Sequence, residues 1–133
     1  YAIRPWQHVM EPLRGYLSLA EHLFNNGSSF AEGWNFGPND EDTKPVSWIV
    51  EQMAELWGND AKWQTDTLEH PHEAHYLKLD ISKARARLNW NPSMRLQDAL
   101  ALTVDWAKLR NKGADMRQVT LSQLQAYQNF NLN

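Results

Sequence analysis

The sequence predicts one domain that mixes α-helices with short β-strands, an α/β chain of the mixed α+β kind. Its 133 residues, 42% of them apolar, are enough to bury a core without metal or disulfide. Apolar residues recur at intervals of three and four over several stretches of helical length, and shorter stretches alternate apolar with polar residues as strands do. The expected order is β–α–β–α–β–β–α–α–α. The strands are too few and too short for a doubly wound sheet.

The first third of the chain predicts an edge strand, a helix and a second strand. Pro5 has no amide donor, so a strand within residues 1–9 lies at an edge or ends at Arg4. Apolar positions then recur over residues 10–25, and a glycine after two asparagines is a typical helix stop. Residues 30–36 alternate apolar and polar side chains, and this alternation predicts a strand.

Turn signals and helical periodicity organise the rest of the chain. Residues 37–42 predict an acidic turn, and a helical stripe follows Pro45 over residues 46–57. The further elements expected are short strands over 62–65 and 76–79 and helices over 82–88, 96–110 and 121–130. The glutamine- and asparagine-rich end predicts that residues 114–133 are a loosely held tail of the single domain 1–133.

Composition argues against several classes of protein. The net charge is −3 and the chain has no basic tract, which disfavours nucleic-acid binding. No apolar run approaches the roughly 20 residues of a membrane span, and no signal peptide is visible. The absence of cysteine leaves no disulfide or thiol chemistry and suits a cytoplasmic protein. Since the chain begins at Tyr1 without an initiator methionine, we expect it to be part of a longer protein.

A histidine-rich loop, His70-Pro-His-Glu-Ala-His75, is the strongest candidate for a binding site. It lies between a proline and a predicted strand, close to a helix start, a position from which it can hold a polar ligand. A surface hairpin that happens to be rich in histidine is the alternative. Metal binding is disfavoured, because in an extended chain Glu73 and His75 point away from His70 and His72 and no cysteine completes a zinc site. Acid–base catalysis by His72 and Glu73 is possible, but neighbours on a loop orient each other poorly.

Arg4 is a second candidate. Its guanidinium lies just before the proline break and can present a planar fork to a carboxylate or a phosphate. From the residues alone, an ordinary exposed arginine is the favoured interpretation.

Three ordered motifs resemble segments of the extended short-chain dehydrogenase/reductase family that acts on nucleotide sugars. They are Ile3-Arg-Pro-Trp-Gln-His-Val9 with Glu11-Pro-Leu13, then Phe30-Ala-Glu-Gly-Trp-Asn-Phe-Gly-Pro38, then the stretch from His70 to Lys83 with Leu88-Asn-Trp-Asn-Pro92. The resemblance extends over nearly the whole chain. It implies that this is the C-terminal sugar-nucleotide-binding subdomain of such an enzyme, with the N-terminal Rossmann half absent.

The resemblance also implies an activity for the full-length enzyme. That enzyme would be an NAD-dependent lyase that oxidises C4 of the glucose in CDP-glucose, eliminates water across C5–C6 and returns the hydride to C6. The product, CDP-4-keto-6-deoxyglucose, would be a precursor of dideoxysugars in bacterial surface polysaccharide such as the lipopolysaccharide O antigen. The family's catalytic Tyr-x-x-x-Lys pair is absent here, because no tyrosine in this chain has a lysine four residues later. The fragment is therefore expected to be inactive alone, to bind no NAD or metal itself, and to work with the missing Rossmann domain in a homo-oligomer.

Residue roles follow from the same resemblance. Arg4 matches the family arginine that contacts the diphosphate, which reverses the interpretation drawn from the residues alone. Glu73 matches a position that often meets the ribose hydroxyls. His70 stands where relatives usually have a phosphate-binding arginine. His72 and Tyr76 are further substrate-binding candidates.

Two alternatives remain open. The chain could come from another enzyme of NDP-sugars, such as an epimerase. It could also be a non-catalytic protein-interaction module that uses its seven tryptophans and its glutamine-rich tail.

Overall fold

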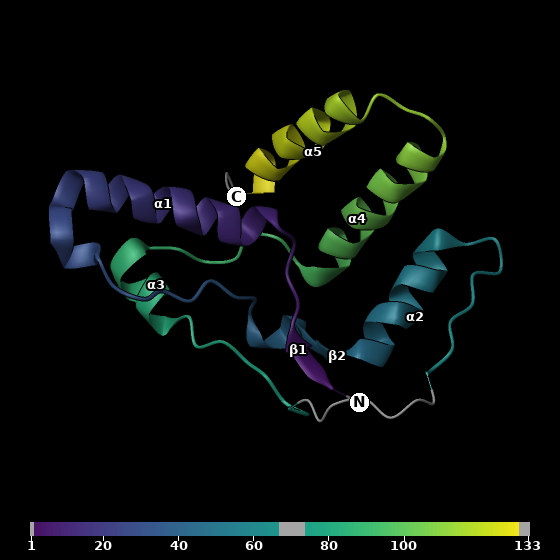
Figure 1. Ribbon diagram of the computed structural model, residues 1–133, viewed down its shortest axis with the longest axis horizontal. Coiled ribbons are helices and arrows are strands. Elements are labelled where there is room, and N and C mark those ends of the chain that lie inside the picture. The colour runs from purple at the N-terminus through teal and green to yellow at the C-terminus, as the bar shows by residue number, and fades with distance from the viewer. Residues whose placement is uncertain (1, 67–73, 131–133) are drawn as a thin grey trace.

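The computed structural model describes residues 2–66 and 74–130, and it mixes five α-helices with a small sheet (Figure 1). The elements run in the order β1 (Ile3–Pro5), α1 (Met10–Asn26), η1 (Gly27–Phe30), η2 (Asp40–Asp42), β2 (Thr43–Pro45), α2 (Val46–Trp57), α3 (Ser82–Leu88), α4 (Leu96–Asn111) and α5 (Met116–Phe130), where η marks a 3-10 helix. The prediction of mixed α and β structure is confirmed. None of the described helices is long and apolar enough to cross a bilayer.

The sheet is a two-stranded antiparallel ribbon in which Arg4 of β1 lies opposite Lys44 of β2. A third segment touches β1 through one parallel bridge between Ile3 and Tyr76. The Ile3 amide donates to the His75 carbonyl at 2.9 Å, and the Leu77 amide donates to the Ile3 carbonyl at 3.1 Å. The strand predicted over residues 76–79 is therefore only a bridge at Tyr76.

Helices α1 to α4 form where the sequence predicted them. Helix α1 ends at Gly27 with φ 66°, and α2 ends at Gly58 with φ 70°, a backbone conformation that glycine adopts without steric cost. Helix α3 ends at Asn89, whose φ of 49° is left-handed, and asparagine is the usual substitute for glycine there.

The strand predicted over residues 30–36 is wrong. Phe30 closes the 3-10 turn η1, and residues 31–37 form neither helix nor strand. The Phe30 and Trp34 rings stack at 5.9 Å, and Trp34 Nε1 donates to the Phe30 carbonyl at 3.0 Å. Alternation forms a strand only when a neighbouring strand completes its hydrogen bonds, and no described strand lies beside this segment. The short strand predicted over 62–65 is also absent.

Three buried clusters make up the described core. One surrounds Trp90, which is 1% exposed and meets the Phe36 ring edge-on at 5.0 Å. A second joins the start of α1 to α4 and α5 through Met10, Met94, Ala99 and Tyr127. The third packs Ile49 of α2 against Leu96 and Leu100 of α4. Figure 1 shows α4 between α2 and α5, as these clusters require.

Helix α5 begins at Met116, earlier than the start predicted at residue 121. The Asp115 carboxylate explains the early start, since it accepts from the Arg117 and Gln118 amides at 3.0 and 3.3 Å as an N-capping residue does. Gln123 and Tyr127 are buried against the rest of the chain. How loosely residues 114–133 are held stays a prediction.

Candidate functional site

Arg4 lies where the sheet meets the chain that follows the histidine-rich loop. Its Nη1 atom donates to the Ile3 carbonyl at 2.9 Å and to the Ala74 carbonyl at 2.8 Å. The contact with Ala74 spans 70 positions of sequence. The guanidinium therefore sits at the end of the loop that the sequence singled out.

A second cation lies opposite Arg4 on the ribbon, and Tyr76 is bridged to the residue before Arg4. Lys44 is the direct antiparallel partner of Arg4, and directly opposite residues project to the same face of a ribbon. Tyr76 is paired with Ile3, the neighbour of Arg4. Two positive charges on one face suit a phosphate group or another anion.

An open cleft continues from Tyr76 along the chain. The Lys78 ammonium lies 5.6 Å from the centre of the Tyr76 ring and 2.9 Å from Asp40 Oδ1. Both contacts raise the pKa of Lys78, and the contact with Tyr76 contributes more than the contact with Asp40. Lys78 and Arg85 line a cleft of about 640 Å³ whose opposite wall is the acidic turn at Asn39 to Glu41. The cleft thus carries both positive and negative charges. Lys78 binds Asp40 of the turn, and Arg85 binds Asn39.

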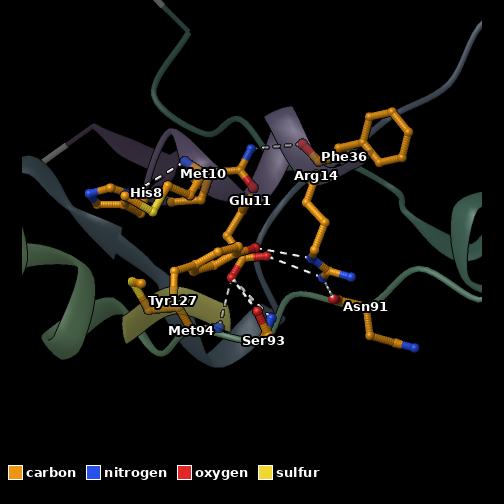
Figure 2. A network of polar contacts seen from close by, with 10 residues as sticks. His8, Met10, Glu11, Arg14, Phe36, Asn91, Ser93, Met94 and Tyr127 are labelled. Carbon is orange, nitrogen blue, oxygen red and sulfur yellow. Dashed lines mark hydrogen bonds and ion pairs between the residues drawn. The ribbon is translucent and has the colours of Figure 1, made fainter. Parts of the chain in front are cut away.

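A buried carboxylate supports the segment that follows Arg4 (Figure 2). Glu11 is 1% exposed. Its Oε1 atom accepts from the Ser93 amide at 3.0 Å, the Ser93 hydroxyl at 2.9 Å and the Met94 amide at 2.7 Å. The first turn of α1 is thereby tied to the connection before α4. In the sequence Glu11 stands out only as part of the first family motif, and nothing in its neighbourhood indicated that it is buried.

Arg14 extends this network to the last helix. Its Nε atom donates to the Tyr127 hydroxyl at 3.0 Å, and its Nη2 atom donates to the Asn91 carbonyl. Nη2 also lies 3.4 Å from Glu11 Oε2. Arg14 therefore joins α1, the connection before α4, and α5, and its role is to hold them together.

His8 and Gln7 fix the connection between β1 and α1. His8 Nδ1 accepts from the Met10 amide at 3.3 Å, so the proton of the neutral ring lies on Nε2. Burial lowers the pKa of His8 from its ordinary value of 6.5, and the nearby Glu11 charge opposes this only in part. Gln7 Nε2 donates to the Phe36 carbonyl at 2.8 Å.

Of the five predicted site residues, the structure describes Arg4 and Tyr76. Arg4 is paired with Lys44, and Tyr76 is bridged to Ile3, the neighbour of Arg4. His70, His72 and Glu73 lie outside the described residues. Within residues 2–66 and 74–130, no group of three or more potential metal-binding side chains comes together.

Comparison with known proteins identifies nucleotide-sugar enzymes as relatives. The chain is 55% identical over 116 residues to a CDP-glucose 4,6-dehydratase from Salmonella typhimurium, in a match that covers 87% of this chain and 32% of that protein. It is 29% identical over 114 residues to a dTDP-glucose 4,6-dehydratase from Haemophilus influenzae, covering 78% of this chain and 32% of the relative. A UDP-glucuronate 4-epimerase from Thermodesulfobacterium geofontis is 33% identical over 63 residues, 47% of this chain and 19% of the relative.

No protein-family model matches the chain. The match spans 32% of the length of each dehydratase, so the chain corresponds to about a third of these relatives. The resemblance drawn from the three sequence motifs is confirmed.

Proposed function

We propose that this chain is the sugar-nucleotide-binding part of a CDP-glucose 4,6-dehydratase of the extended short-chain dehydrogenase/reductase family. The observation that carries the proposal is 55% identity over 116 residues to an enzyme of that name. Identity to the dTDP-glucose enzyme over a similar length is 29%. The difference favours the cytidine nucleotide.

Arg4 is proposed to bind the diphosphate. A guanidinium matches two phosphate oxygens with two parallel N–H donors. The position of Lys44 opposite Arg4 supports this role, because a diphosphate needs more than one positive charge. The remaining contacts are assigned to Tyr76 and, outside the described residues, to His70, His72 and Glu73, with the Glu73 carboxylate meeting the ribose hydroxyls.

The redox chemistry is proposed to belong to residues that this chain lacks. NAD, when bound to the full-length enzyme, supplies the hydride acceptor and donor. The present chain holds the nucleotide end, and this remote binding energy positions the sugar for reaction. Formation of CDP-4-keto-6-deoxyglucose, assembly as a homo-oligomer and a cytoplasmic location complete the proposal.

A hybrid enzyme tests the proposal. The 116 aligned residues of the Salmonella relative are replaced by those of this chain, and the hybrid is assayed with CDP-, dTDP- and UDP-glucose. Conversion of CDP-glucose to a 4-keto-6-deoxy product, with the other two sugars much slower, is expected. A folded hybrid that prefers dTDP- or UDP-glucose would instead identify the chain as part of another NDP-sugar enzyme, the alternative that the weaker similarities suggest.

A further inference from the structure

The ribbon that carries Arg4 and Lys44 has little backbone pairing of its own. Strands β1 and β2 have three residues each. Pro5 and Pro45 belong to these strands, and a proline has no amide to donate to the ladder. A two-stranded ribbon is at best marginally stable without further packing. The positions of Arg4 and Lys44 therefore depend on contacts from outside the ribbon.

The middle and the end of β2 are held by neighbouring aromatic and backbone groups. Trp6 Nε1 donates to the Lys44 carbonyl at 2.9 Å. The Lys44 ammonium lies 5.7 Å from the centre of the Trp48 ring. The Val46 amide, just after the strand, donates to the Ala2 carbonyl at 3.0 Å. None of these contacts fixes the start of the strand.

The start of β2 is held by a buried carboxylate. Asp42, the residue before the strand, is 3% exposed, and Arg95 Nε lies 3.2 Å from its Oδ2 atom. Nη2 of the same guanidinium lies 2.9 Å from Oε2 of the exposed Glu41. A buried charge is costly unless it is paired. The Asp42 side chain is therefore confined to the place where Arg95 meets it.

Arg95 is in turn anchored to the core through the chain that follows it. It immediately precedes α4. The next residue, Leu96, is buried in the cluster with Ile49 and Leu100, against which Trp48 packs. The Arg95 side chain itself is half exposed. It thus extends from a fixed point at the start of α4 to the start of the ribbon.

We propose that Arg95 is a positioning residue of the diphosphate site: its pair with Asp42 fixes the start of β2 and so holds the Lys44 ammonium on the same face as the Arg4 guanidinium. Lys44 lies two residues after Asp42 and directly opposite Arg4. Directly opposite residues project to one face, so a shift of β2 moves one cation relative to the other. Binding of one diphosphate by two cations depends on their separation.

This inference rests on the proposed function for its ligand, and it adds the residue that sets the geometry of the two cations. Arg95 does not contact the diphosphate in this account. Its effect on binding passes through Asp42 and the main chain of β2 to Lys44. An effect of that kind has to disappear when the Lys44 ammonium is removed.

A double-mutant cycle on the hybrid enzyme tests the inference. The affinity for CDP is measured by titration calorimetry for Arg95→Gln, once with Lys44 present and once with Lys44→Gln. Arg95→Gln should weaken binding about tenfold in the first background and less than about twofold in the second. Lys44→Gln alone should weaken binding about tenfold. A general loosening of the fold would instead weaken binding by the same factor in both backgrounds.

Matched variants isolate the contact with Asp42. Asp42→Asn removes the buried charge and should reproduce the effect of Arg95→Gln, again only when Lys44 is present. Glu41→Gln removes the exposed partner of the same guanidinium and should leave CDP affinity within about twofold of the original, since an exposed ion pair contributes little. Arg95→Lys keeps the charge but loses the planar fork, and its affinity should be intermediate. If circular dichroism shows that Arg95→Gln is unfolded, Arg95→Lys takes its place in the cycle.

Three results would overturn the inference: an equal loss of affinity in both Lys44 backgrounds, unchanged affinity in Arg95→Gln, or unchanged affinity in Lys44→Gln. A loss from Glu41→Gln as large as that from Arg95→Gln would also overturn it. A hybrid that binds dTDP or UDP in place of CDP would end the proposed function. The cycle is then run with that nucleotide, because all three carry the diphosphate, and it decides the role of Arg95 independently.

Discussion

The Glu11 Oε1 atom lies 2.7 Å from the Met94 amide nitrogen, across 83 positions of sequence. Two further donors from Ser93 meet the same oxygen. One carboxylate oxygen thus holds the start of α1, and through it the segment carrying Arg4, against the connection that leads into α4. The candidate site is on the surface, and this buried contact anchors the helix that follows it.

Replacing Glu11 tests that contact. Glu11→Ala should lower the free energy of unfolding by about 3 kcal/mol or more, because it leaves buried donors without an acceptor. Glu11→Gln keeps one carbonyl oxygen for those donors and should cost about 1 kcal/mol. Urea unfolding measures both values. Equal losses for the two variants would show that the charge, rather than the accepting oxygen, is what matters.

The close approach of α1 to Phe36 predicts an unusual response to alanine. A Cβ on Gly15 would lie 2.4 Å from Phe36 Cδ1. Alanine in a helix normally gains up to about 1 kcal/mol over glycine, but overpacking costs about 1–3 kcal/mol. Gly15→Ala should therefore destabilise the chain. Gly33→Ala, whose added Cβ meets nothing within 4 Å, is the control, and a stabilised Gly15→Ala variant would refute the packing described here.

His8 should make the chain less stable in mild acid. Burial lowers the pKa of His8 below 6.5, so the unfolded chain takes up the proton first as pH falls. This contribution to stability is complete above pH 6.5 and is lost as pH falls through the lowered pKa. An NMR titration should give His8 a pKa below 6.5, and His8→Asn should reduce the loss of stability between about pH 7.5 and 5.5. A measured pKa at or above 6.5 would contradict the burial of His8.

Tyr127 tests whether α5 is docked. Its side chain is 6% exposed and its hydroxyl accepts from Arg14 Nε at 3.0 Å. Tyr127→Ala should cost about 3–5 kcal/mol of unfolding free energy, and Tyr127→Phe about 1 kcal/mol. Hydrogen exchange of α5 in the unaltered chain provides the companion measurement. Fast exchange throughout α5, with little effect of Tyr127→Ala, would support the loosely held tail that the composition predicts.

Helices were predictable here because their signals are local. The periodicity of α1 and the glycines that end α1 and α2 act within a few residues, and both helices formed where expected. The strand over 30–36 was wrong because alternation does not tell whether a neighbouring strand is there to pair with it, and no described segment supplies one. The same limit applies to α1, where Leu17 and Phe24 belong to the periodic apolar positions but are 73% and 91% exposed. Periodicity tells which residues share a face but not what that face meets.

The candidate site was likewise predictable only in part. Arg4 and Tyr76 were named from motif resemblance, and the structure bridges Tyr76 to Ile3, the neighbour of Arg4, although neither pattern required it. Glu11 was missed because its partners, Ser93 and Met94, are more than 80 positions away. A buried carboxylate has the same sequence signature as one at an exposed helix start.

The most direct test of the central claim is the affinity for CDP-glucose of the hybrid enzyme carrying Arg4→Ala, measured by titration calorimetry beside Arg4→Lys. Loss of a charge-assisted contact to the diphosphate should weaken binding by about 10- to 150-fold, with partial retention in the lysine variant. Unchanged affinity in the alanine variant would contradict the account, because the diphosphate would then be held elsewhere.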